Sequence, residues 1–195
     1  MLAKILENHH LILASGSPRR QKFFKDLGVP FEIRLKPVNE VYPEHLKGAE
    51  ISDYLAELKA QPFKNELKEN EILITSDTIV WHQSKALGKP KDAKEAFDMI
   101  RSLSGYKHEV ITSVCFTTAS GQITKHDTTA VYFNEISNDE INYYISNYKP
   151  FDKAGAYGIQ EWIGYIAINK IEGSYFTVMG LPLHLVYKTL TTMAT

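Results

Sequence analysis

The 195-residue sequence has little cysteine and no long apolar run. One cysteine, Cys115, cannot form a disulfide within the chain, which fits a reducing compartment, and its apolar surroundings predict a small buried side chain. No apolar run approaches membrane-spanning length, and the N-terminus lacks a signal-peptide pattern. We therefore expect a cytoplasmic protein that does not associate with membranes.

Excess charge is also missing. A formal net charge of −1 argues against general nucleic-acid binding, which needs a broad basic surface, so any anion site must be local. There is no Walker A loop and no G-x-G-x-x-G motif, and the seven histidines follow no metal-binding spacing. Without repeats or low-complexity tracts, the chain is expected to form a single domain over residues 1–195.

Predicted helices and strands intermix along the whole sequence. Capping boxes at Asp92 with Glu95 and at Ser137 with Glu140 predict helix starts, and Pro182 predicts a last one. The expected strands cover residues 11–14, 31–35, 72–80, 108–118, 122–134 and 165–171, and the expected helices cover 18–27, 48–60, 92–103, 137–147 and the segment after 182. This pattern predicts an α/β or α+β fold with a mixed sheet.

The stretch Leu11–Arg20 combines an apolar strand, small residues and a helix start. Ser17 is a good N-cap, and Pro18 suits the first helical position. Free backbone N–H groups at a helix N-terminus bind phosphate, and Arg19 and Arg20 add positive charge there. An ordinary helix cap with two solvated arginines explains the same residues equally well.

A charged residue, Asp77, interrupts the apolar run at residues 72–80. A buried carboxylate needs a metal, a cation or a backbone donor as its partner, unless Asp77 simply caps a turn at the end of the strand. Downstream, Gly88-Lys89-Pro90 follows a predicted hairpin that would return Lys89 toward Asp77, although a lone lysine is usually a surface residue.

The stretch Asp152–Gln160 contains two glycines among small residues. Such a loop permits close approach to a flat ligand or to another part of the chain. The Gln160 amide can donate and accept at once, while Asp152 and Lys153 are expected to pair with each other.

Together these stretches resemble the Maf family of nucleoside triphosphate pyrophosphatases. The resemblance rests on motifs in the same order along nearly the whole chain: Ala14-Ser15-Gly16-Ser17-Pro18-Arg19-Arg20, Ser76-Asp77-Thr78, Gly88-Lys89-Pro90, Ser104-Gly105, Asp152 to Gln160, Gly173-Ser174-Tyr175 and Val178-Met179-Gly180-Leu181-Pro182. It implies an inosine-triphosphatase-like (Maf/Ham1) fold with a mixed sheet, two lobes around a deep cleft and a homodimer. The arginine pair and the Ala-Tyr-Gly-Ile-Gln run are similar to the branch that hydrolyses dTTP and UTP.

The resemblance also implies roles for individual residues. Asp77 would be the proton acceptor, and Arg19, Thr78 and Gln160 would set substrate choice. The remaining family positions are Ser15, Arg20, Glu40, Lys59 and Lys89. The sequence departs from the family where Leu58 precedes Lys59 and where Asn39 precedes Glu40.

These residue types suit hydrolysis of the α–β phosphoanhydride bond to a monophosphate and pyrophosphate. Glu40 and Asp77 can bind a divalent cation, Mg²⁺ or Mn²⁺, and either carboxylate can instead activate water. Arg20 and Lys89 would hold the leaving pyrophosphate. Three other functions stay open: a 7-methyl-GTP pyrophosphatase, a non-catalytic nucleotide-binding regulator of septum formation, and an RNA-contacting protein.

Overall fold

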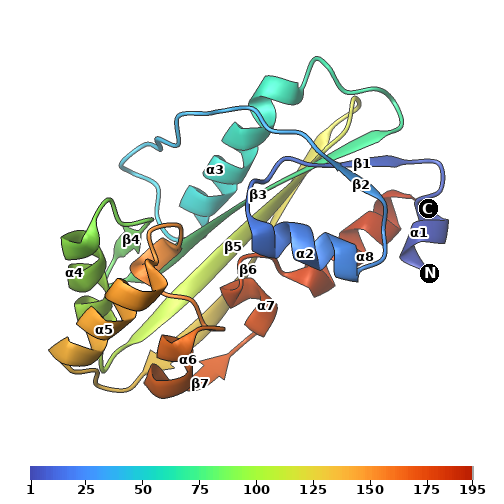
Figure 1. Ribbon diagram of the computed structural model, residues 1–195. Helices are drawn as coiled ribbons and strands as arrows, with labels where there is room; N and C mark the ends of the chain where they lie inside the picture. Colours follow the sequence, from blue (N-terminus) through green and yellow to red (C-terminus); the bar gives the residue numbers. More distant parts are fainter. Residues whose placement is uncertain (195) are drawn as a thin grey trace. The chain divides into compact units, whose positions relative to one another are not determined.

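The computed structural model describes residues 1–194, whose strands form one seven-stranded sheet (Figure 1). The strands are β1 (His10–Leu13), β2 (Phe31–Ile33), β3 (Glu71–His82), β4 (Lys85–Leu87), β5 (Lys107–Thr117), β6 (Gln122–Phe133) and β7 (Ile168–Glu172). Their order is β2-β1-β3-β5-β6-β7, with β4 paired to β3. Strand β1 is parallel to β2 and β3, whereas the β3–β4 and β6–β7 pairs are antiparallel. The prediction of a mixed sheet is confirmed.

The helices are α1 (Leu2–Ile5), α2 (Pro18–Asp26), α3 (Ala49–Ala60), α4 (Ala93–Leu103), α5 (Asn138–Tyr148), α6 (Trp162–Ala167), α7 (Tyr175–Val178) and α8 (Leu183–Met193). Two short 3-10 turns, η1 (Gln61–Phe63) and η2 (Ala154–Ala156), follow α3 and α5 respectively. Within residues 1–194, no helix is long and apolar enough to cross a membrane.

The chain divides into two compact units. Unit 1 comprises residues 1–77, 112–127 and the segment from 180 on, and unit 2 comprises residues 78–111 and 128–179. Strands β3, β5 and β6 each continue from one unit into the other. The predicted site residues divide likewise: Ser15, Arg19, Arg20, Glu40, Lys59 and Asp77 belong to unit 1, and Thr78, Lys89 and Gln160 belong to unit 2.

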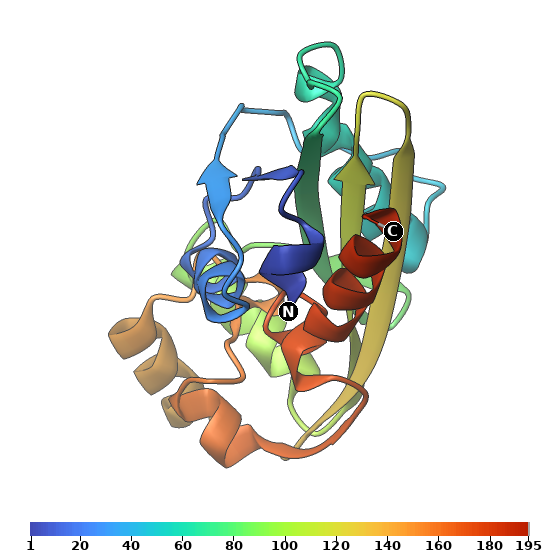
Figure 2. The same cartoon turned by 90° about the vertical axis from the view of Figure 1, so that its right-hand side faces the viewer.

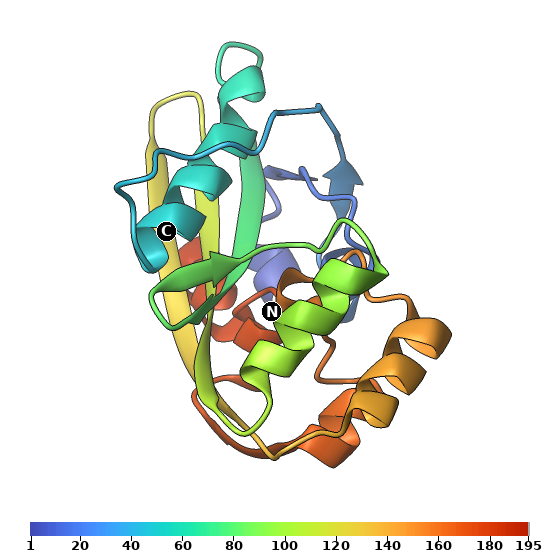
Figure 3. The ribbon, with the colours of Figure 1, turned by 90° about the vertical axis from the view of Figure 1, so that its left-hand side faces the viewer.

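In unit 1, helix α3 packs on one face of the sheet because its apolar residues recur at helical spacing. Ala56 lies against Ile12, Leu73 and the fully buried Cys115, as predicted for that cysteine. The Thr75 hydroxyl donates to the Ala56 carbonyl oxygen at 2.6 Å. Figures 2 and 3 show α8 on the opposite face of the outer part of the β5–β6 hairpin, and α1 packs beside α8.

In unit 2, helices α4 and α5 pack side by side (Figure 3) over a core that includes Val110, Val131 and Phe133 from the sheet. The Ser137–Glu140 capping box is confirmed: the Ser137 side chain accepts from the Glu140 N–H, and the Glu140 side chain accepts from the Ser137 N–H. These local bonds start α5, and Tyr144 from its buried face is part of the same core.

The predicted strand at residues 165–171 is wrong in its first half. Residues 165–167 end helix α6, and β7 begins only at Ile168. Ile163 and Ala167, four residues apart, are both buried, while Tyr165 is 75% exposed. Burial of one helical face therefore selects a helix for this short apolar run, which would also suit a strand.

Other predictions were incomplete. The short helices α1 and α7 were not predicted, and β2 ends at Ile33 rather than at residue 35. Asp92 caps α4 by accepting from the Glu95 N–H at 2.8 Å, but the Glu95 carboxylate accepts from the Lys91 N–H at 2.7 Å. The N-cap at Asp92 is thus confirmed, but the reciprocal bond of the predicted capping box is replaced by one from the residue before the N-cap.

Candidate functional site: a charged cluster and a braced loop

Helix α2 starts where the sequence predicts, with Ser17 at the N-cap position and Pro18 at the first helical position, although the Ser17 side chain makes no capping hydrogen bond. The buried Ser15 side chain accepts a hydrogen bond from the Ser17 N–H at 3.3 Å. The Ser15 carbonyl oxygen accepts from the Gln21 side chain at 3.0 Å, so the turn is tied to the helix that follows it. Arg19, in the first helical turn, is partly buried.

Arg20 binds the protein's own backbone. Its Nε donates to the carbonyl oxygen of Gly180 at 2.7 Å, and its Nη1 donates to that of Ser76 at 2.8 Å. Burial lowers the pKa of Arg20 to about 10, and the carboxylate of Asp77 opposes this shift, so the guanidinium remains charged at neutral pH. The side chain links the start of α2 to the peptide just before Asp77, a role that the sequence did not indicate.

Asp77 lies inside β3 and not at its end, which excludes the simple turn-capping interpretation. Its side chain is 9% exposed, and its Oδ1 is 2.6 Å from Nζ of Lys59, which lies in the last turn of α3. The same Nζ is 3.3 Å from Oε1 of Glu40. One ammonium group thus brings together two carboxylates from a strand and a loop that are far apart in sequence.

This cluster fits a divalent cation of the Mg²⁺ type. Mg²⁺ is usually held by one or two carboxylates together with substrate phosphates. Two carboxylates converge here, and no set of three His, Cys, Asp or Glu side chains in residues 1–194 is arranged to hold a metal by itself. An ion at Asp77 and Glu40 would therefore depend on phosphate oxygens for its remaining ligands.

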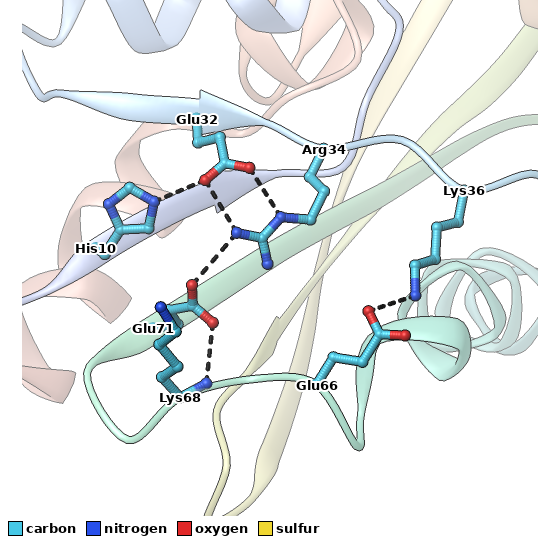
Figure 4. A network of polar contacts seen from close by, with 7 residues as sticks. All are labelled: His10, Glu32, Arg34, Lys36, Glu66, Lys68 and Glu71. Carbon is cyan, nitrogen blue, oxygen red and sulfur yellow. Dashed lines mark hydrogen bonds and ion pairs between the residues drawn. The ribbon is translucent and has the colours of Figure 1, made fainter.

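A second network of charges in unit 1 has a different character. Arg34 lies between Glu32 and Glu71, and His10 contacts Oε2 of Glu32, which also accepts from Arg34 (Figure 4). Each carboxylate in this network has a cationic partner or a backbone donor, including the Lys68 N–H on Glu71. The network joins the starts of β1 and β3 to the edge strand β2, which identifies it as structural.

In unit 2, the Lys89 segment and the glycine-containing loop lie together. The Gly88 carbonyl oxygen accepts from the Gly155 N–H at 3.0 Å, and Lys89 itself is exposed. Gly155 has φ of 67°, and a Cβ there would lie 2.7 Å from Cγ2 of Val80, so glycine is required on both grounds. Thr78, at the start of this unit, is partly buried.

The loop from residue 153 to 161 is braced by partners that sequence reasoning missed. Lys153 pairs with Glu161 at 3.1 Å as well as with the expected Asp152 at 2.8 Å. The hydroxyl group of the buried Tyr157 hydrogen-bonds Nε2 of His108 at 2.8 Å. Tyr144 donates to Glu161. No local pattern marks Tyr144 or His108, because both partners are distant in sequence.

Gln160 is partly buried near the end of this loop, and its carbonyl oxygen accepts from the Tyr165 hydroxyl at 2.8 Å. The structure therefore gathers Glu40, Lys59 and Asp77 in unit 1, with Arg20 bound next to them at Ser76. In unit 2 it gathers the segments that carry Lys89 and Gln160.

Comparisons with known proteins identify the family of this chain. A family model described as Maf-like protein matches residues 10–193. A relative from Flavobacterium johnsoniae named dTTP/UTP pyrophosphatase is 63% identical over 193 residues, which cover 99% of this chain and 100% of that one. A relative of the same name from Bacteroides fragilis is 48% identical over 191 residues, covering 97% and 98% respectively.

The fold also has a counterpart among solved structures. The Staphylococcus aureus Ham1 protein matches with a TM-score of 0.52 at 12% identity, over 94% of this chain and 99% of that one. At this identity the likeness concerns the fold alone, and it confirms the expected fold class.

Proposed function

The chain belongs to the Maf family, and from this premise we propose that it is a nucleoside triphosphate pyrophosphatase that hydrolyses dTTP and UTP to the monophosphate and pyrophosphate. The observation that carries the proposal is the Glu40–Lys59–Asp77 cluster, in which a carboxylate from the middle of an apolar strand is held beside a second one. Relatives up to 63% identical over almost their whole length are named dTTP/UTP pyrophosphatase, which supports the substrate choice.

In this proposal Asp77 accepts the proton of the water that attacks the α-phosphorus. Lys59 holds Oδ1 of Asp77 at 2.6 Å and so fixes the direction of the carboxylate. Arg20 holds the Ser76 peptide and adds a positive charge next to Asp77, and Arg20 and Lys89 bind oxygens of the leaving pyrophosphate, with Ser15 as a further substrate-binding residue.

Catalysis is proposed to need Mg²⁺ or Mn²⁺, which Glu40 and Asp77 would hold. When bound, the ion supplies positive charge that neutralises the phosphate oxygens. This assignment predicts that Glu40→Gln weakens Mn²⁺ binding, measured directly by calorimetry with a non-hydrolysable UTP analogue present. Unchanged Mn²⁺ affinity would remove Glu40 from the metal site.

Base choice is proposed to depend on Gln160, with Thr78 and Arg19. Uracil and thymine present an N3–H donor beside a carbonyl acceptor, and one carboxamide can satisfy both groups. Because Glu lacks the amide donor, Gln160→Glu is expected to lower kcat/KM for UTP and dTTP more than for 7-methyl-GTP. An equal loss on all three nucleotides would show that Gln160 only braces the loop.

A screen of nucleoside triphosphates with pyrophosphate release as the readout tests the proposed function. We expect release from dTTP and UTP that requires a divalent cation, and greatly reduced release by Asp77→Asn. Preference for 7-methyl-GTP would favour that branch of the family instead. Nucleotide binding without release would favour a non-catalytic regulator of septum formation.

Further proposals concern the oligomeric state, the compartment and the nucleic-acid binding of the protein. We propose a cytoplasmic homodimer that forms no stable complex with nucleic acid. Light scattering at micromolar concentration tests the dimer. A titration with RNA at low salt tests the second point, because tight salt-dependent binding would contradict it.

A further inference from the structure

The loop that carries Glu40 has no helix or strand of its own. It runs from Arg34, just after β2, to Gly48, just before α3. The Glu40 side chain is 42% exposed there, yet its Oε1 lies 3.3 Å from Nζ of Lys59 in α3. An exposed ion pair alone contributes little stability, so the backbone of this loop needs a further attachment if the carboxylate is to stay in one place.

Lys36 attaches this loop to the segment that follows α3. Its Nζ donates to the carbonyl oxygen of Pro62 at 2.9 Å and lies 4.9 Å from the centre of the fully buried Phe63 ring. Figure 4 shows the same Nζ beside Glu66, whose Oε2 is 2.6 Å away. One ammonium group thus contacts a carbonyl oxygen, an aromatic face and a carboxylate within residues 62–66.

The contacts of Lys36 and of Glu40 join the same two segments of the chain. Lys36 and Glu40 are four residues apart in the loop, and Lys59 and Pro62 are three residues apart at the end of α3. Four residues of fully extended chain span at most about 13–14 Å. The attachment at Lys36 therefore confines Glu40 to the neighbourhood of Lys59, whereas the other end of the loop, Gly48, is eight residues away from Glu40.

Two local features stiffen the chain between Lys36 and Glu40. Pro37 fixes its own φ and restricts Lys36 to an extended backbone. The Asn39 carbonyl oxygen accepts from the Val41 N–H at 2.8 Å, so Glu40 is the central residue of a γ-turn. This turn fixes the backbone of Glu40 and with it the direction in which the side chain leaves. The attachment at Lys36 is therefore transmitted to the carboxylate.

We propose that Lys36 is a positioning residue, which holds the Glu40 carboxylate at the proposed metal site by fastening its loop to the end of α3. The inference rests on the proposed function, because it requires that Glu40 binds the metal ion. Lys36 acts through the backbone, four residues away from the carboxylate that it places.

The first test compares the Mn²⁺ affinity of Lys36→Met, Lys36→Arg and the wild type, by calorimetry with a non-hydrolysable UTP analogue present. Met keeps an unbranched apolar stem against Phe63 but loses the charge and the donor, whereas Arg keeps both. We expect Lys36→Met to weaken Mn²⁺ binding by about tenfold, the lower end of the effects of removing groups that support metal ligands. Lys36→Arg should restore most of the affinity, and unchanged affinity in Lys36→Met would overturn the proposal.

A double substitution shows whether Lys36 acts through Glu40. In the Glu40→Gln background, Lys36→Met should cause no further loss of Mn²⁺ affinity, because the carboxylate that Lys36 places is already absent. The same factor of loss in both backgrounds would mean that Lys36 acts elsewhere, and would overturn the proposal.

Backbone order parameters from NMR test the metal-free protein. Lys36→Met should lower those of residues 38–42 from rigid values of about 0.85 toward flexible values below about 0.6, while those of α3 stay unchanged. Unchanged values in the loop would overturn the proposal. A decrease of the same size in α3 would also overturn it, because Lys36 would then stabilise the unit as a whole.

Lys22→Met is the matched control. Lys22 forms an ion pair with Asp26 within one helix, and the two side chains are 72% and 55% exposed. The substitution removes the same charge from unit 1 but should leave Mn²⁺ affinity unchanged. A loss equal to that of Lys36→Met would show that only the net charge matters, and would overturn the proposal.

The outcomes separate this inference from the proposed function. If Glu40→Gln weakens Mn²⁺ binding and Lys36→Met does not, only the role of Lys36 fails and the proposed function stands. If Glu40→Gln leaves Mn²⁺ affinity unchanged, Glu40 is not a metal ligand, and the proposed metal site and the role of Lys36 fail together.

Discussion

The two units of this protein hold their polar residues in contrasting ways. In unit 1, full charges face each other: Lys59 joins Asp77 to Glu40, and Arg20 binds two backbone carbonyl groups beside them. In unit 2, the loop that carries Gln160 is held by two tyrosine hydroxyl groups, one on His108 and one between Gly158 and Glu161, and by the Lys153–Glu161 ion pair.

The contrast matches the chemistry proposed for each unit. A triphosphate carries several negative charges, and unit 1 supplies cations and carboxylates that attract phosphate or a metal ion. A uracil ring is neutral, and its recognition needs a donor and an acceptor in fixed directions, which the Gln160 amide is proposed to provide. Substitutions in the Glu40–Lys59–Asp77 cluster should therefore change turnover on every nucleotide, whereas substitutions in the loop that carries Gln160 should change selectivity or stability.

The largest effect is expected from Asp77→Asn. The amide keeps the size of the side chain but cannot accept a proton, and loss of a general base typically lowers kcat by roughly 100-fold or more. Steady-state pyrophosphate release from UTP and dTTP measures the loss. Full activity in this variant would contradict the role of the charged cluster.

Arg20→Ala should reduce both stability and activity. Two charge-assisted hydrogen bonds are lost, each worth about 1.5–3 kcal/mol, and a change of 1 kcal/mol shifts Tm by about 2–4 °C in a protein of this size. Activity should fall by a similar factor on UTP, dTTP and 7-methyl-GTP, because the residue acts on the Asp77 segment and phosphates.

Arg101→Ala is the control for Arg20. Arg101 of unit 2 donates to the backbone oxygen of Ile136 and to the hydroxyl oxygen of Ser104. Its loss should lower Tm but leave kcat/KM of the folded protein unchanged. A change of base preference in Arg20→Ala, instead of a uniform loss, would contradict the contrast between the units.

His108 should make unit 2 sensitive to acid. Burial, with a smaller contribution from His82, lowers the pKa of His108 to about 3 from its usual 6.5. Between pH 6.5 and 3 the unfolded chain binds a proton that the folded chain does not, so the free energy of unfolding falls as pH falls through this window. The free energy of unfolding, measured with urea at several pH values, should depend less steeply on pH in His108→Leu than in the wild type.

The Tyr157→Phe variant distinguishes the effect of His108 protonation from that of the Tyr157–His108 hydrogen bond. This variant loses the Tyr157–His108 bond but keeps the buried imidazole, so its stability should be lower at all pH values while the slope between pH 6.5 and 3 stays that of the wild type. Equal slopes in the wild type and in His108→Leu would show that His108 is not the acid-sensitive group.

The smallest effect is expected at the exposed network of unit 1. Hydrogen bonds first from Arg34 and then from His10 lower the pKa of Glu32 to about 2 from 4.5. Its ionised form therefore stabilises the fold above about pH 4.5, and this contribution disappears as pH falls toward 2. Glu32→Gln should lower Tm slightly at pH 7 and not at pH 2, as thermal unfolding can measure.

Local signals in the sequence predicted most element boundaries. Pro18 and the Ser137–Glu140 pair act within one helical turn, so their effect does not depend on the rest of the chain, and the apolar spacing of residues 49–60 marks the helical face that packs on the sheet. The run at residues 165–171 was misassigned because short apolar segments suit a helix or a strand until packing selects one.

The sequence by itself determined that Asp77 is an exception in an apolar strand and needs a partner. Only the tertiary structure decided that the partner is Lys59, that Arg20 binds Ser76 and Gly180, and that Tyr144 holds Glu161. The physical reason is distance along the chain. A local hydrogen bond is determined by neighbouring residues. These long-range pairs form only after strands and helices have packed and excluded the water molecules that would otherwise hydrogen-bond the same groups.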